Sequence, residues 1–182
     1  MAGYMLLGAI IESVTKLTFS EVVEQNILIP LGMTNTCYLD HHKLVPGIAS
    51  AYVREGDDIV HRAHVNFVHG NGASGLVSTV QDLLIWESAL YTTKPLSREY
   101  LDTYLAPHVT KYAPSYYGYG WYLSDITLND QPRRIHFHSG GGSGFIIRNE
   151  ADEQTIIMLN NIPSDSLYHI GIELLSEINE KD

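Results

Sequence analysis

The sequence predicts an α+β fold in which helices come first, an antiparallel sheet follows, and one helix closes the chain. Three observations support this. Apolar residues recur at helical spacing in several segments of the first hundred residues. Between about residues 133 and 160, the period changes to the alternation that is typical of strands. Helical spacing then returns in an apolar stripe from Leu167 to Ile178.

The composition is that of a folded protein of one domain, which we expect to span residues 1–182. The 182 residues are 45% hydrophobic and 18% charged, and a chain of this length buries roughly 70% of its unfolded surface. The net charge is −10 and no cluster of Lys and Arg occurs, so we expect no nucleic-acid partner. Cys37 is the only cysteine, which excludes a disulfide within the chain.

The first helix is expected to run from the start of the chain to about Thr15–Lys16. Because no capping residue precedes its apolar stripe, we expect a domain that is truncated on its N-terminal side. The segment Thr18–Glu21 has the pattern of a capping box and predicts the start of a second helix. Pro30 and the residues up to Met33 should break that second helix.

The middle of the chain predicts loops, a small hairpin and two helices. Residues 37–72 are mixed and indicate loop with one hairpin, whose turn contains Gly56. Ser78 or Thr79 should cap a helix over residues 80–91. Ser97 should cap the next helix.

Strand signals dominate the last third of the sequence. Three antiparallel strands are expected near residues 133–138, 144–149 and 154–160. Residues 149–153 then form a hairpin loop. The aromatic run from Tyr116 to Leu123 is a further strand candidate, although such a run is more often packed in a core than exposed in a cleft.

The segment from His138 to Phe145, His-Ser-Gly-Gly-Gly-Ser-Gly-Phe, is the most distinctive in the chain. Its glycines interrupt two strands, so backbone N–H groups lie where a ligand could approach closely. Taken alone, the segment would more simply be a glycine-rich connection without a ligand.

Several segments together resemble the serine β-lactamase and penicillin-binding-protein-like superfamily. They are Gly3–Glu12, Ile29–Thr36, Gly72–Leu83 with Trp86–Leu90, Tyr117–Trp121, His138–Gly140 and Gly144–Phe145. The resemblance covers nearly the whole chain and points to class C β-lactamases, D-Ala-D-Ala carboxypeptidases and esterase-like members. It implies that the chain is the C-terminal part of the β-lactamase/transpeptidase-like fold.

The resemblance also implies roles for four residues. The family uses a Ser-x-x-Lys motif, a Tyr-x-Asn motif, and Lys-Thr-Gly or His-x-Gly on a strand of the cleft. His138 and Gly141 match catalytic positions of the third motif, and Ser139 and Gly140 match substrate-binding positions. The Gly141 N–H would form half of an oxyanion hole, where one donor contributes roughly 3 kcal/mol.

The other two motifs are not found in this chain. Ser13 and Lys16 have Ser-x-x-Lys spacing, but at the end of a predicted helix and not at a helix start, so we interpret the match as coincidence.

The implied whole protein is an acyl-serine enzyme that acts on an amide or ester and needs no cofactor. Without its nucleophile, this chain alone should be inactive. Full-length relatives are often extracytoplasmic, but no signal or membrane segment is evident here, so the compartment stays open.

Two other functions and one partner surface remain to be considered. The chain could be a truncated, non-catalytic remnant that binds a ligand. It could also be a metal hydrolase built on His61, His64 and His69, although loop histidines are more often solvated. The strand at 154–160 should present an open edge that a second copy, a swapped element or a missing N-terminal half covers.

Overall fold

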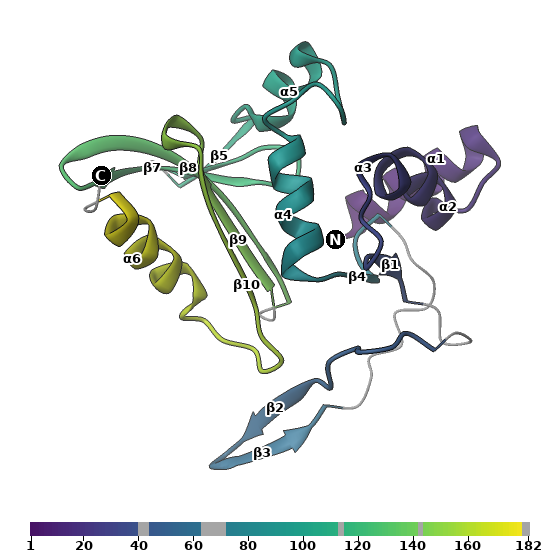
Figure 1. The fold of residues 1–182 in the computed structure, drawn as a ribbon, viewed down its shortest axis with the longest axis horizontal. Helices are drawn as coiled ribbons and strands as arrows, with labels where there is room; N and C mark the ends of the chain where they lie inside the picture. The colour runs from purple at the N-terminus through teal and green to yellow at the C-terminus, as the bar shows by residue number, and fades with distance from the viewer. Residues whose placement is uncertain (40–43, 63–71, 113–114, 142–143, 180–182) are drawn as a thin grey trace. The chain divides into compact units, whose positions relative to one another are not determined.

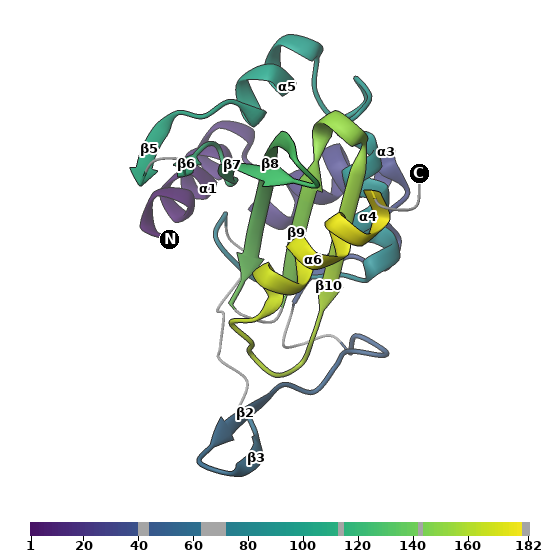
Figure 2. The same cartoon turned by 90° about the vertical axis from the view of Figure 1, so that its left-hand side faces the viewer.

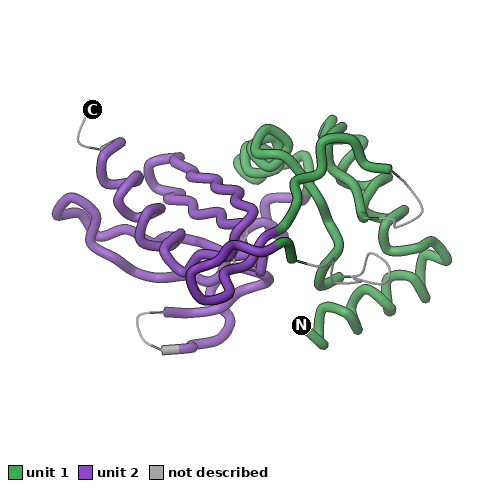
Figure 3. Tube along the Cα trace, turned by 90° about the horizontal axis from the view of Figure 1, so that it is seen from below, with its two compact units in different colours: residues 1–51, 61–95 green, residues 52–60, 96–182 purple. Residues whose placement is uncertain are grey.

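The computed structural model describes residues 1–39, 44–62, 72–112, 115–141 and 144–179. The chain forms two compact units (Figure 3), one of residues 1–51 and 61–95 and one of residues 52–60 and 96–182. Helices and antiparallel strands build both units, which confirms the α+β class. Within the described residues, no helix has the length and apolar run that a membrane crossing needs.

The first unit is mainly helical (Figure 1). Its elements are α1 (Ala2–Thr15), α2 (Phe19–Val23), the π-helix η1 (Glu24–Leu28), α3 (Ile29–Leu31) and α4 (Val80–Ala89), with β1 (Cys37–Tyr38) paired to β4 (Leu76–Val77). The predicted end of the first helix is confirmed, because Lys16 adopts a left-handed conformation with φ 63°. The capping box is also confirmed, with Thr18 and Glu21 bonding to each other's backbone N–H groups.

The predicted break over residues 30–33 is confirmed, because α3 ends at Leu31 and Gly32 caps it. Pro30 lies inside α3, directly after the π-helical turn, and the helix ends at Gly32 with φ 76°. Proline lacks an N–H donor, and the wider π turn before it accommodates the missing hydrogen bond. The helix predicted over residues 80–91 ends at Ala89 and is capped by the Thr79 side chain, which accepts from the Asp82 N–H.

Segments of the family resemblance that are distant in sequence meet inside the first unit. Gly8 of α1 lies against Gly72, so closely that a Cβ on Gly8 would stand 2.9 Å from the Gly72 nitrogen. The buried Asp82 carboxylate accepts a hydrogen bond from the Asn35 N–H (2.8 Å) and one from the Thr36 hydroxyl (2.7 Å). Small residues and one buried acid therefore hold these segments together.

The second unit is built on one antiparallel meander of six strands, where three had been predicted. They are β5 (Val109–Tyr112), β6 (Ser115–Tyr117), β7 (Tyr122–Leu128), β8 (Gln131–Gly140), β9 (Gly144–Asn149) and β10 (Gln154–Leu159), in the order β10-β9-β8-β7-β6-β5. The remaining elements are α5 (Arg98–Leu105), η2 (Glu150–Asp152), α6 (Leu167–Asn179) and a separate hairpin of β2 (Tyr52–Glu55) and β3 (Asp58–His61).

The three predicted strands are present; of the three additional ones, β6 and β7 include parts of the aromatic run, and β5 lies before it. That run is not one strand but β6, a turn and the start of β7. The turn needs glycine, because a Cβ on Gly118 would stand 2.6 Å from the Ala106 carbonyl oxygen. Gly120, with φ 89°, supplies the second unusual backbone conformation.

The main core of this unit lies between the sheet and α6 (Figure 2). Ile135, Ile147 and Leu175 are fully buried there. The middle of α6 approaches the strands closely, because a Cβ on Gly171 would stand 3.0 Å from Ile147 and 3.1 Å from Phe145. Close packing of this kind fixes β8 and β9 in place.

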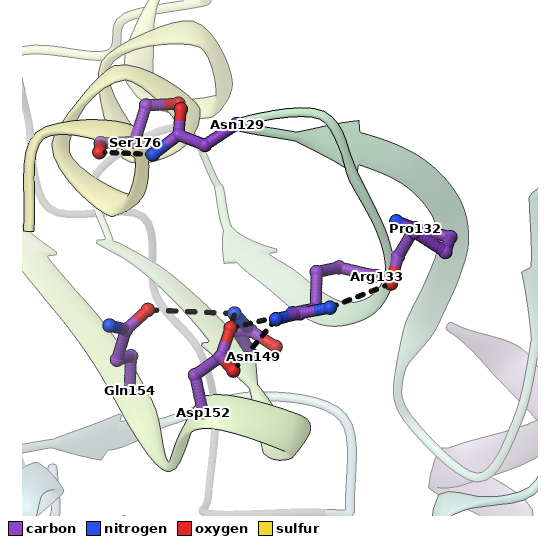
Figure 4. A network of polar contacts seen from close by, with 7 residues as sticks. All are labelled: Asn129, Pro132, Arg133, Asn149, Asp152, Gln154 and Ser176. Carbon is purple, nitrogen blue, oxygen red and sulfur yellow. Dashed lines mark hydrogen bonds and ion pairs between the residues drawn. The ribbon is translucent and has the colours of Figure 1, made fainter. Parts of the chain in front are cut away.

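A polar network holds the beginning of β8 (Figure 4). The Arg133 guanidinium donates to both carboxylate oxygens of Asp152, at 2.6 and 3.1 Å. The Asn149 amide donates to the same carboxylate at 2.6 Å. Asn129, in the turn before β8, donates to the Ser176 carbonyl of α6 at 2.8 Å. The hairpin predicted over residues 149–153 is part of this network.

Candidate functional site

The candidate site is the C-terminal end of β8, which is longer than the predicted strand and includes His138, Ser139 and Gly140. On one side, β8 pairs with β9 up to the pair of Gly140 and Gly144. On the other side, its pairing with β7 ends at Phe137 and Tyr122. Among the described residues, none pairs with His138–Gly140 on the β7 side. A strand that is paired on one side only leaves alternate N–H and C=O groups open to a ligand.

His138 lies exposed at this end of the strand. Its ring lies 5.8 Å from the Tyr122 ring with a tilt of 36°. Partial burial lowers the pKa of His138 below its ordinary value of 6.5, and a hydrogen bond involving the Ser139 backbone acts in the opposite direction. The imidazole is therefore mostly neutral at pH 7 and can both accept and donate a hydrogen bond.

Gly140 and Gly141 leave the end of the strand open. Among the described residues, no atom lies within 4 Å of the place where a Cβ would stand on either glycine. Gly141 has φ 58°, a left-handed conformation that turns the chain away from β8 directly after the last paired residue. Nothing in the described chain fills the space over Gly140, so an extended group could lie against the backbone there.

Ser139 points to the opposite face of the strand, as alternation requires. It lines a cavity of about 540 Å³ on the α6 side of the sheet, together with aromatic residues of β7, β8 and β9. The sequence analysis did not identify this cavity. Its aromatic residues, such as Tyr122 and Phe137, were visible in the sequence, but they also fit a plain core.

His136, two residues before His138, is held in a different environment. Its side chain is 3% exposed, and its Nε2 lies 2.9 Å from the Leu105 carbonyl oxygen. Since a carbonyl only accepts, Nε2 carries the proton in the neutral ring. Burial lowers the pKa of His136, and the Leu105 hydrogen bond opposes that shift. This histidine is therefore part of the interior of the unit.

Of the three histidines proposed from the sequence as a metal site, only one lies among the described residues. His64 and His69 lie outside the described residues, and His61 lies in β3. In the described parts of the chain, no group of three or more His, Cys, Asp or Glu side chains could hold a metal ion.

The Ser-x-x-Lys match at Ser13 has no catalytic geometry. Ser13 lies in the last turn of α1, and Lys16 is the left-handed residue that ends this helix. The Lys16 ammonium donates to the Ser13 carbonyl oxygen at 2.7 Å and both residues are exposed. The lysine therefore caps the helix, which supports the interpretation that the spacing is a coincidence.

A comparison with known protein families identifies the chain's relatives. The model of the family described as "Beta-lactamase" matches residues 1–175. Penicillin-binding protein 4* of Bacillus subtilis (strain 168) is 26% identical over 186 residues, which cover 93% of this chain and 41% of that protein.

Solved structures share the fold of this chain. The octameric penicillin-binding protein homologue from Pyrococcus abyssi matches 98% of this chain and 41% of its own with a TM-score of 0.83 and 23% identity. D-amino acid amidase from Ochrobactrum anthropi matches 99% of this chain and 58% of its own with a TM-score of 0.72 and 20% identity. At these identities the likeness shows the fold alone. The chain spans less than half the length of the Bacillus and Pyrococcus proteins.

Proposed function

Because this chain belongs to the Beta-lactamase family, we propose that the end of β8 forms one wall of the active site of a serine acyl-hydrolase. The observation that carries the proposal is the one-sided pairing of His138–Gly140, which opens a backbone edge next to an uncovered glycine. Such an edge can bind an extended amide or ester through the backbone and leave its carbonyl near a fixed donor.

Each residue of this wall has a role that suits its geometry. Gly141 would contribute its N–H to the developing oxyanion, since its left-handed backbone directs the chain away from the paired strands. Gly140 would leave room for the acyl group, because its Cα face is open. His138 would hydrogen-bond near the nucleophile or to a substrate carboxylate. Ser139 would contact the substrate from the other face of the strand.

The reaction would proceed through an acyl-serine intermediate. A serine oxygen attacks the carbonyl of an amide or ester, the amine or alcohol leaves, and water then releases the acid. The D-amino acid amidase among the structural relatives supports an amide, and the penicillin-binding relatives support a β-lactam or D-alanyl peptide. The catalytic serine and its lysine are not among the segments that match the family here, so we propose that this chain alone is inactive.

The proposal is tested by intact mass. The 182-residue chain is incubated with a reactive penicillin and, separately, with a fluorophosphonate, and its mass is then measured. We expect no adduct with either reagent on a chain whose circular dichroism remains that of the folded protein. A stoichiometric adduct would contradict the proposal that the nucleophile lies elsewhere, and peptide mapping would show whether Ser13 carries it.

The edge of the sheet provides a second proposal, which concerns partners. β10 is the outermost strand beside β9, so its other edge has no strand partner among the described residues. We propose that a second copy, a swapped element or a separate N-terminal half pairs with this edge. The Pyrococcus homologue is octameric, which supports assembly as one of these routes. Light scattering after gel filtration should give a mass above one chain, and a monodisperse monomer would contradict pairing between copies.

A further inference from the structure

The pairing of β7 with β8 stops at Tyr122, beside the candidate site. Tyr122 forms the last pair of the two strands, opposite Phe137. The chain turns directly before Tyr122, over residues 118–121. His138 is therefore the first residue of β8 without a described strand neighbour on the β7 side.

The Tyr122 ring contacts two successive side chains of β8. It stacks on the Phe137 ring, with the ring centres 5.5 Å apart and 21° between the planes. It also lies 5.8 Å from the centre of the His138 ring, at 36°. Successive side chains of a strand point to opposite faces of the sheet. One ring can meet both of them only where the pairing stops, because a neighbouring strand would otherwise lie between them.

Contacts from three strands hold the Tyr122 ring in place. Besides the stack on Phe137 of β8, Tyr117 of β6 meets it edge-on, with ring centres 4.8 Å apart and 70° between the planes. The Lys111 ammonium of β5 lies 4.4 Å from the centre of the same ring. Edge-on and stacked aromatic pairs, and a cation over a ring, are each favourable. The ring is therefore a fixed surface.

The His138 side chain has few restraints of its own. It is exposed, and within the described chain Tyr122 is its only ring contact. The other contact is a hydrogen bond involving the Ser139 backbone. An exposed side chain without packing neighbours is free to exchange between staggered rotamers. The orientation of the imidazole therefore depends on the Tyr122 ring.

We propose that Tyr122 is a positioning residue of the candidate site. Its fixed ring takes the place of the missing strand neighbour and holds the His138 imidazole at the open end of β8. This step rests on the proposed function, in which His138 hydrogen-bonds near the nucleophile or to a substrate carboxylate. Tyr122 lies outside the sequence segments that indicated the family, so its role follows from these contacts alone.

A second histidine and tyrosine pair in the same unit provides a control. The rings of His108 and Tyr119 lie 4.3 Å apart, also at 36°, and both side chains are exposed. Nε2 of His108 lies 2.7 Å from the Thr103 carbonyl oxygen, so a hydrogen bond of its own fixes this ring. Removal of Tyr119 should therefore affect neither the orientation of His108 nor any property of His138.

The first measurement needs no substitution at Tyr122. In the folded chain near neutral pH, nuclear Overhauser effects between the ring protons of Tyr122 and His138 should be present, because the ring edges lie closer together than the centres. The His138 signals are assigned by their absence from His138→Gln. A folded chain without these effects would overturn the proposal.

Two variants then test whether the contact places the imidazole. Tyr122→Leu keeps an apolar side chain but removes the flat ring. The pKa of His138 should then rise toward its ordinary value of 6.5, because burial lowers this pKa and the Tyr122 ring supplies part of that burial. Tyr122→Phe keeps the ring and should leave the pKa unchanged. Titration of the ring ¹⁵N shifts measures the pKa in each variant.

Tyr119→Leu is the matched control and should leave the pKa of His138 unchanged. The proposal is overturned if folded Tyr122→Leu has the wild-type pKa at His138, or if Tyr122→Phe or Tyr119→Leu raises that pKa as much. Circular dichroism shows whether each variant is folded. If Tyr122→Leu does not fold, the Overhauser effects between Tyr122 and His138 in the wild-type chain decide.

These outcomes are independent of the mass experiment. A penicillin adduct would remove the proposal that the chain lacks a nucleophile and leave the His138 measurements intact. An unchanged His138 pKa in Tyr122→Leu, on a chain that also forms no adduct, would remove only the positioning role of Tyr122.

Discussion

The two halves of strand β8 differ in what surrounds them. Residues 135–137 lie between β7 and β9, and Ile135 among them is completely buried. Residues 138–140 have β9 on one side only, and all three are exposed. A single strand thus serves as a fixed frame in its first half and as an open edge in its second. The rigid half can position the open half, so substitutions in the two halves should have different consequences.

The largest expected difference is in stability. Ile135→Ala should lower the free energy of unfolding by about 3 kcal/mol, because it leaves a cavity in a closely packed core. His138→Ala, in the other half of β8, should lower it by less than about 0.5 kcal/mol because its side chain is exposed. Urea unfolding followed by circular dichroism measures both. Equal losses would show that the open half is part of the core.

A smaller difference is expected between two adjacent glycines. Gly141→Ala should cost about 1 kcal/mol, because its φ of 58° is unfavourable for a residue with a Cβ. Gly140→Ala should change stability by less than about 0.5 kcal/mol, because its Cβ would meet open space. The same urea experiment compares them. If Gly140→Ala is the more harmful change, then the space over Gly140 is not open.

The two histidines should differ in their effect on pH dependence. The pKa of His136 in the folded chain lies below its ordinary value of 6.5. At pH values between the two, the unfolded chain therefore binds a proton at this ring more readily than the folded chain does. Stability should therefore be greatest above pH 6.5 and fall as the pH decreases from there toward the folded-state pKa. His136→Gln should flatten this fall more than His138→Gln, which removes an exposed ring. Unfolding midpoints from pH 7.5 to 5 test this, and an equal effect of both variants would contradict it.

The smallest effect is expected at the start of β8. Hydrogen bonds from Arg133 and Asn149 lower the pKa of Asp152. The ionised Asp152 carboxylate contributes to stability at pH values above its ordinary pKa of 3.8. This contribution is lost as the pH falls through the lower pKa of the folded state. Asp152→Asn should therefore shift the unfolding midpoint slightly at pH 7 and reduce the acid sensitivity near pH 3. Wild-type acid sensitivity in this variant would show that the contact contributes nothing.

Local patterns in the sequence were sufficient for much of the fold. Alternation placed β9 and β10, helical spacing placed α6, and the capping box marked the start of α2. Each of these depends on residues close together in the chain. The division of the aromatic run could not be predicted in this way, because it depends on the approach of Gly118 to the Ala106 carbonyl. Likewise, the wide π turn before Pro30 is a local irregularity that no propensity indicates.

The candidate site shows the same limit. The glycines after His138 indicated an open backbone. The structure shows that the open side is the one toward β7, because the pairing of β7 with β8 ends before His138. The roles of His138, Ser139, Gly140 and Gly141 came from the family resemblance and remain a proposal. The cavity beside Ser139 needed the third dimension, since its walls come from separate strands and from α6.

Hydrogen exchange along β8 tests the central distinction most directly. In the folded chain near neutral pH, the amides of Ile135, His136 and Phe137 should exchange slowly, close to the rate set by unfolding of the sheet. Among residues 138–141, at least one amide should exchange orders of magnitude faster, because only alternate groups there face β9. Uniformly slow exchange from Ile135 to Gly141 would show that the second half of β8 is covered, and it would contradict the proposal of an open substrate-binding edge.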